Sequence, residues 1–330
     1  MKYFTEPHGK FVMQIPIEWQ YKNILSNIGD VSPYSFELYE NSVGAFQISC
    51  YPISDRKFDP SILIQKSNTR GLEFTEQRLD DDDFNCHLWL CIVEDHFILA
   101  KYIYDSNPKD LEIINKELKK AKTSLSTVEF LSSEKRVEAF NLNKCKEFLA
   151  AIAASFDLKN NAFKNNAFIE LIILTANQID AYLRFSLMMK KQIDNKINDI
   201  DITLIYQGDK DAVISEREIY NKAKENNVIS EELFNKLQGL YNKRNKIVHR
   251  YIISDIKTKD LIDIAYSYEV ICNEVQLKLK EIEDFQMENK IGVYGNWKDL
   301  NKEYTSEDIN YLMSQVNDKH FLDALKRSIS

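Results

Sequence analysis

An arginine and a histidine five residues apart carry the clearest chemical potential in this chain of 330 residues. They lie in the segment Leu240-Tyr-Asn-Lys-Arg-Asn-Lys-Ile-Val-His-Arg-Tyr251. Positions three and four apart share a face of a helix, which places Arg244 on an apolar stripe. The stripe consists of Leu233, Leu237, Leu240, Ile247 and Val248. Because arginine is seldom buried without a partner or a task, this placement marks a candidate site.

The two side-chain types suit cleavage of RNA without a metal ion. In that reaction the ribose 2′-OH attacks the adjacent phosphate, so one group must move protons and another must stabilise the phosphorane. Histidine suits the first role because its ordinary pKa lies nearest neutral pH. Arginine suits the second because its planar fork can hold two phosphate oxygens. We therefore expect His249 to transfer protons and Arg244 to hold the phosphate.

Helix geometry limits how these two side chains can cooperate. Five helical residues rotate by about 140° and rise by about 7.5 Å, so a continuous helix would not aim both at one point. Either the helix loosens near Val248, or the site is shared between two chains. Asn245 is expected to cap the helix end or orient His249, and Tyr251 to line the cleft.

Positive charge gathers around this motif. No acidic residue occurs from Leu233 to Ser254, and five basic residues fall inside that window: Lys236, Lys243, Arg244, Lys246 and Arg250. A local patch for an anionic ligand is one interpretation, with Lys243, Lys246 and Arg250 contacting RNA; a solvated helix face is the other. The formal net charge of −8 argues against a protein that coats nucleic acid generally.

A structural role for the arginine is the competing hypothesis. Arg244 would then pair with a carboxylate on a neighbouring helix, such as Glu170 or Asp180, and His249 would be a surface residue. Both roles can coexist, since Asp180 can hold the guanidinium's orientation while its outer edge faces substrate.

Hydrophobic spacing predicts an α+β N-terminal domain followed by an all-α bundle. Residues 1–130 contain alternating, aromatic-rich runs typical of an antiparallel sheet, and Asn107-Pro108 opens a helix that would pack on it. The runs are Lys10–Ile15, Tyr34–Tyr39, Ala45–Tyr51, Cys86–Val93 and Phe97–Tyr104. Residues 131–290 show helical spacing, with capping residues at Ser215 and Ser230. Residues 291–330 form a C-terminal extension with one expected helix, Thr305–Lys326.

A helical bundle carrying Arg244-Asn-x3-His249-x-Tyr251 before its last long helix resembles the HEPN superfamily. The resemblance covers residues 134–287 and implies a metal-independent endoribonuclease, usually a homodimer whose two motifs share one cleft, in bacterial phage defence or a toxin module. Residues 8–130 resemble PsbP-like α/β sandwiches, which implies a sensing or regulatory domain where a trigger or regulatory protein would bind. The alternative is a non-catalytic HEPN-fold protein that binds a partner or nucleotide.

The remaining sequence features favour few other classes. The five cysteines form no Cys-x-x-Cys pair and fit reduced core positions. No Gly-rich phosphate loop, nucleophile elbow or His-Glu-x-x-His motif occurs, so we expect neither a cofactor nor a metal. No run approaches the roughly 18 apolar residues of a membrane span, so a cytoplasmic protein without membrane contact is expected.

Overall fold

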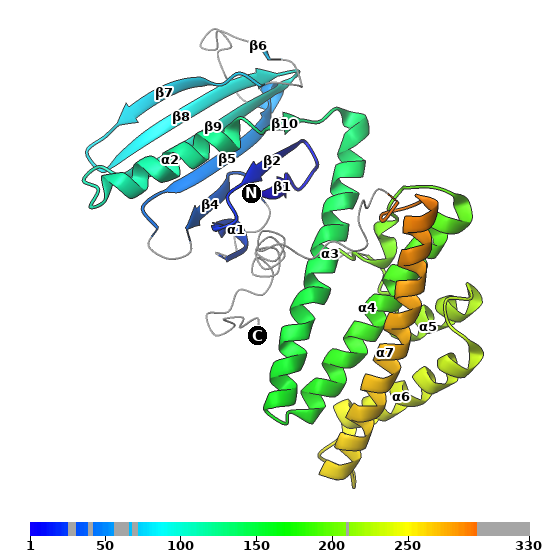
Figure 1. Cartoon of the computed structure of the whole chain (residues 1–330). Coiled ribbons are helices and arrows are strands. Elements are labelled where there is room, and N and C mark those ends of the chain that lie inside the picture. Colours follow the sequence, from blue (N-terminus) through cyan, green and yellow to red (C-terminus); the bar gives the residue numbers. More distant parts are fainter. Residues whose placement is uncertain (26–30, 39–41, 56–65, 68–71, 209–210, 296–330) are drawn as a thin grey trace. The chain divides into compact units, whose positions relative to one another are not determined.

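The computed structural model describes residues 1–25, 31–38, 42–55, 66–67, 72–208 and 211–295 (Figure 1). The described chain forms two compact units that divide between Asn143 and Lys144, inside a long helix. The fold class is α+β, with the strands in the N-terminal unit and a group of helices in the C-terminal unit.

The described residues of the N-terminal unit form a seven-stranded and a three-stranded sheet. The larger sheet has the order β3 (Trp19–Tyr21), β4 (Tyr34–Leu38), β5 (Ala45–Pro52), β9 (His96–Asp105), β8 (Phe84–Val93) and β6 (Lys66–Ser67), with β7 (Thr75–Asp80) also pairing with β8. The smaller has the order β1 (Lys2–Thr5), β2 (Phe11–Ile15) and β10 (Glu129–Phe130). Every described pairing is antiparallel except β6 with β8. Short helical turns follow β3 and β5, namely α1 (Lys22–Leu25) and η1 (Ile53–Asp55).

The alternating sequence explains the larger sheet. In β9, Ile98, Ala100 and Tyr102 are almost fully buried, whereas the residues between them are partly exposed. That period of two places one face of the strand on a core. Helix α2 (Leu111–Leu125) contributes Ile114, Ala121 and Leu125 to the same core. The five predicted strands are confirmed, while β1, β3, β6, β7 and β10 escaped prediction because they are short or mainly polar.

A buried carboxylate ties three segments of this unit together. Glu6 is 1% exposed and accepts hydrogen bonds from the backbone N–H groups of His8 and Lys10, each 2.9 Å, and from the Tyr34 hydroxyl at 2.8 Å. Burial acts to raise the pKa of Glu6, but the bonds from Lys10, Tyr34 and His8 outweigh it and lower that pKa. The ionised form is therefore the one that this fold stabilises.

We expect Glu6→Gln to lower the free energy of unfolding of the N-terminal unit by about 1–3 kcal/mol at neutral pH, because a charged acceptor is removed. A lowered folded-state pKa contributes stability above the unfolded-state pKa, and that stability disappears as pH falls through the folded value. The difference between wild type and variant should therefore shrink in acid. Urea denaturation followed by tryptophan fluorescence measures it, because Trp19 and Trp89 are buried here. A difference independent of pH would show that the Glu6 charge contributes nothing.

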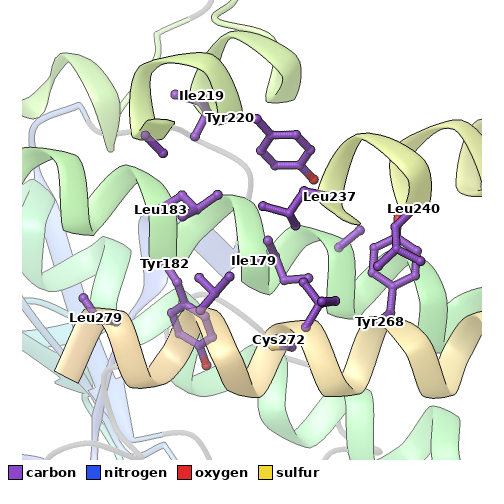
Figure 2. Packing of buried hydrophobic residues seen from close by; sticks show 14 of the residues in the cluster. Ile179, Tyr182, Leu183, Ile219, Tyr220, Leu237, Leu240, Tyr268, Cys272 and Leu279 are labelled. Atoms are coloured by element: carbon purple, nitrogen blue, oxygen red, sulfur yellow. The ribbon is translucent and has the colours of Figure 1, made fainter. Parts of the chain in front are cut away.

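The C-terminal unit is a helical bundle built around one apolar helix. Its elements are the second part of α3 (Ser133–Lys164), then α4 (Phe168–Asn195), η3 (Ile202–Leu204), α5 (Glu216–Glu225), α6 (Glu231–Arg250) and α7 (Thr258–Asn289). Half of the α4 residues are buried, which is typical of a helix surrounded by others. Figure 2 shows Ile179 and Leu183 of this helix in one buried cluster with Tyr220 of α5, Leu237 of α6 and Tyr268 of α7.

Local capping determines where α5 and α6 begin. Ser215 and Glu218 form the predicted capping box, and the Ser230 hydroxyl accepts from the Leu233 N–H at 3.2 Å. These bonds satisfy N–H groups that have no partner inside the helix. Both predictions are confirmed, and they place the start of α5 at Glu216.

Only the start of the C-terminal extension lies within the described residues. The turn Gly292–Gly295 contacts the bundle: the Gly292 N–H donates to Asn198 Oδ1 at 2.8 Å and the Tyr294 N–H to Gln286 Oε1 at 3.3 Å. The expected helix Thr305–Lys326 lies outside the described residues.

All five cysteines are buried and free, as the sequence predicts. Among the described residues, none of the helices combines the length and the apolar composition that a bilayer crossing requires.

Candidate functional site

Helix α6 presents the candidate motif on a continuous α-helix. Leu233, Leu237, Leu240 and Ile247 are buried, and Arg244 lies on the same stripe with 16% of its side chain exposed. The stripe ends earlier than predicted, because Val248 is 47% exposed. The guanidinium therefore lies at the edge of the core and retains contact with solvent.

Arg244 is held by three neighbours. Its Nη1 donates to Glu216 Oε2 at the first turn of α5, and its Nη2 donates to Asn245 Oδ1 at 3.1 Å. Its Cζ lies 4.9 Å from the centre of the Tyr241 ring, within the range of a cation–π contact. Burial opposes the charge, but Glu216 outweighs burial and raises the pKa of Arg244. The carboxylate partner is thus Glu216, and the predicted partners Glu170 and Asp180 are wrong.

The Glu216 carboxylate is itself fixed by a second bond. The Tyr220 hydroxyl, one turn along α5, donates to Glu216 Oε1. Burial and this carboxylate raise the pKa of Tyr220, so the phenol stays protonated and remains a donor. The chain Tyr220–Glu216–Arg244–Asn245 therefore connects α5 to α6.

Asp180 has a different role from the one expected. It lies on α4, where its Oδ2 accepts from Arg184 Nε at 2.6 Å. Arg184 also donates to the carbonyls of Leu204 and Ile214, at 3.1 and 2.8 Å, which anchors the segment before α5. Burial raises the pKa of Asp180, and the charges of Arg184 and Arg244 oppose that shift. Asp180 accepts its hydrogen bond from Arg184, so its interaction with Arg244 is electrostatic attraction without a hydrogen bond.

His249 lies on the last turn of α6 and is exposed. Because α6 stays helical through Arg250, the first of the two alternatives, a helix that loosens near Val248, is excluded. His249 and Arg244 consequently point about 140° apart in one protomer. Tyr251 is the C-cap residue and is 39% exposed. Asn245 Oδ1 accepts a hydrogen bond from Arg244 Nη2, whereas a contact with the helix end or with His249 was expected.

The predicted RNA-contacting cations are exposed, but their surroundings are mixed in charge. Lys243, Lys246 and Arg250 are all exposed. Lys243 and Lys246 line a hollow of about 450 Å³ together with Asp255, Asp260 and Asp263. The segment Leu233–Ser254 contains no acidic residue, but two of its lysines lie beside aspartates of the segment that follows it.

Sequence reasoning overlooked the contribution of α5. Glu216 and Tyr241 contact Arg244, and Arg217 contacts the same Tyr241 ring, with its Cζ 4.6 Å from the ring centre. The capping box predicts where α5 starts, but no spacing in the sequence shows that its first turn packs beside α6. Within the described residues, no three His, Cys, Asp or Glu side chains are placed to share a metal ion.

No family model matches this sequence, and no curated protein matches it significantly. Among solved structures, a protein from Bacteroides thetaiotaomicron aligns with 74% of this chain and 79% of its own length, at 14% identity and a TM-score of 0.28. That likeness is too weak to indicate a shared fold or function. The function therefore has to be inferred from the chemistry of the site.

Proposed function

We propose that the C-terminal unit is a metal-independent endoribonuclease of the HEPN type, in which two copies of the chain contribute Arg244 and His249 to one cleft. The observation that carries the proposal is the position of the motif. Arg244 lies at the edge of the bundle core, His249 is exposed on the same helix, and the long helix α7 follows. This order and the Arg-Asn-x3-His-x-Tyr pattern match the family that the sequence resembles.

The surroundings of Arg244 suit a phosphate-binding role. Glu216 and Asn245 engage two nitrogens of a guanidinium that has five N–H donors, so donors remain for a ligand at its exposed side. Its orientation is set before any ligand arrives, which favours stabilisation of a developing phosphorane. His249, exposed to solvent, can exchange protons with the 2′-OH and the leaving oxygen.

Helix geometry supports the proposal of a shared cleft. Since one protomer directs Arg244 and His249 to different sides of α6, cooperation requires a second copy. Apolar side chains beside the motif support such an association: Ile252 is 93% exposed, Ile253 81% and Val248 47%. A group of exposed apolar residues is typical of a surface that binds another protein. We therefore infer a homodimer that buries these residues.

The rest of the chain suggests a regulated nuclease. The N-terminal unit, with its larger sheet and packed helix, is consistent with a PsbP-like sandwich that senses a trigger or binds a regulatory protein. Phage defence or a toxin module in bacteria is the biological setting that the HEPN resemblance implies.

A non-catalytic interaction protein is the second candidate, favoured by the Arg244–Glu216 pair. A guanidinium paired with a carboxylate in its own protomer can serve to connect α5 with α6. Such a protein would form a stable complex with a partner and leave RNA uncut even with its trigger present.

RNA cleavage by the purified full-length protein tests the proposal. A labelled single-stranded RNA should be cut equally well with and without EDTA, and the products should end in 2′,3′-cyclic phosphates, because the 2′-OH is the nucleophile. The solution mass should be that of a dimer. Cleavage that EDTA abolishes, or products that lack the cyclic phosphate, would contradict the mechanism.

A further inference from the structure

Arg217 is an ordered cation beside the candidate site, and neither the motif nor the family resemblance includes it. It occupies the second position of α5 and is exposed. Its Nη2 donates to Asn242 Oδ1 at 2.7 Å, and its Cζ lies 4.6 Å from the Tyr241 ring centre. These two contacts, with an amide and an aromatic ring, restrict the rotamers of an exposed side chain that would otherwise adopt many conformations.

Arg217 and Arg244 share one aromatic neighbour. Each guanidinium carbon lies less than 5 Å from the centre of the Tyr241 ring, so the two cations are less than about 10 Å apart. Both also donate to asparagine side chains of α6, Arg217 to Asn242 and Arg244 to Asn245. The first turn of α5 and the middle of α6 therefore hold two oriented guanidinium groups next to one aromatic ring.

The two arginines differ in the net charge of their immediate surroundings. Arg244 is paired with Glu216, which leaves that pair close to neutral. Arg217 has an amide and a ring as neighbours, and among the described residues no carboxylate forms an ion pair with it. Arg217 therefore contributes a positive charge that has no carboxylate partner in the described part of the chain, beside the nearly neutral Arg244–Glu216 pair. A planar guanidinium is suited to bidentate contact with phosphate oxygens.

We propose that Arg217 binds a backbone phosphate of single-stranded RNA next to the phosphate held by Arg244, with Tyr241 and Asn242 orienting it. The proposal rests on the nuclease function inferred above, because that function supplies the polynucleotide. It assigns electrostatic recruitment to Arg217 and charge stabilisation during cleavage to Arg244. Arg217 is thus a substrate-binding residue that affects KM more than kcat.

Binding of a single-stranded 2′-O-methyl RNA tests this assignment. The methyl group blocks the attacking hydroxyl, so binding is measured without cleavage. Fluorescence anisotropy at several salt concentrations would compare wild type, Arg217→Gln, Arg217→Lys and Lys222→Gln. Lys222 is the matched control, because it is another exposed cation of α5, about 140° around the helix from Arg217.

We expect Arg217→Gln to weaken binding on the order of tenfold. The slope of log affinity against log salt should fall by about 0.7 for each phosphate that the variant no longer binds. Arg217→Lys should retain the slope and part of the affinity, and Lys222→Gln should bind like wild type. Equal affinity and slope for Arg217→Gln and wild type, or an equal weakening by Arg217→Gln and Lys222→Gln, would overturn the assignment.

Cleavage assays separate a failure of this assignment from a failure of the nuclease function. If wild type cuts RNA and Arg217→Gln keeps the same KM, only the assignment of Arg217 is wrong. If Arg217→Gln weakens RNA binding as expected but neither wild type nor any variant cuts RNA, the nuclease proposal is wrong and the protein only binds RNA here. Circular dichroism of each variant confirms that the fold is unchanged.

Discussion

Replacing His249 with alanine is expected to lower the rate of RNA cleavage by about 10²–10⁴-fold, the usual contribution of a general acid or base. The side chain is exposed at the end of α6 and contributes little to packing, so the free energy of unfolding should change by less than about 0.5 kcal/mol. Single-turnover cleavage of a labelled RNA measures the first effect, and urea denaturation measures the second.

A matched control distinguishes a loss of catalysis from a loss of charge at this end of α6. Arg250→Gln removes a neighbouring exposed cation and should weaken RNA binding while leaving the cleavage step of bound RNA nearly unchanged. His249→Ala that cuts RNA at the wild-type rate would exclude His249 from the reaction.

Replacing Arg244 with methionine is expected to abolish cleavage and also to destabilise the C-terminal unit by about 3 kcal/mol. The destabilisation arises because Glu216, with 13% of its side chain exposed, would keep its charge near the core without a cationic partner. Unfolding followed by circular dichroism, which reports mainly the helices, measures the change.

The double variant Arg244→Met/Glu216→Gln separates the structural role of the arginine from its catalytic one. Removing both charges leaves no unpaired ion, so the double variant should regain much of the stability that Arg244→Met removes. Cleavage should remain absent, because the phosphate-binding cation is still missing. A double variant that cuts RNA as wild type does would show that Arg244 acts only as a structural ion-pair partner.

The fold class and most of the long elements could be predicted from the sequence, because their apolar residues recur at clear strand-like or helix-like intervals. Alternation in Phe97–Tyr104 appears as β9, one residue longer at each end, and the helical spacing of residues 131–290 appears as the bundle helices, including α7. Short strands such as β3 and the mainly polar β7 carry too few apolar positions for a period to show. Their pairing partners stabilise them, and partners far along the chain are not visible in local spacing.

The site was predictable only along a single helix. Spacing within α6 places Arg244 on the apolar stripe and His249 off it, and the structure agrees on both. The partner of Arg244 depends on how α5 crosses α6, which side-chain packing between helices decides. Glu216 therefore replaced the expected Glu170 and Asp180, and Arg217 was overlooked.

Mixed dimers test the shared cleft most directly. Two forms of the full chain with different affinity tags, His249→Ala and Arg244→Met/Glu216→Gln, would be co-expressed and the mixed dimer isolated. Each variant alone should be inactive on RNA, whereas the mixed dimer should cut it, because one copy supplies the arginine and the other the histidine. A mixed dimer as inactive as both parents, under conditions where wild type cuts RNA, would contradict a cleft built from two chains.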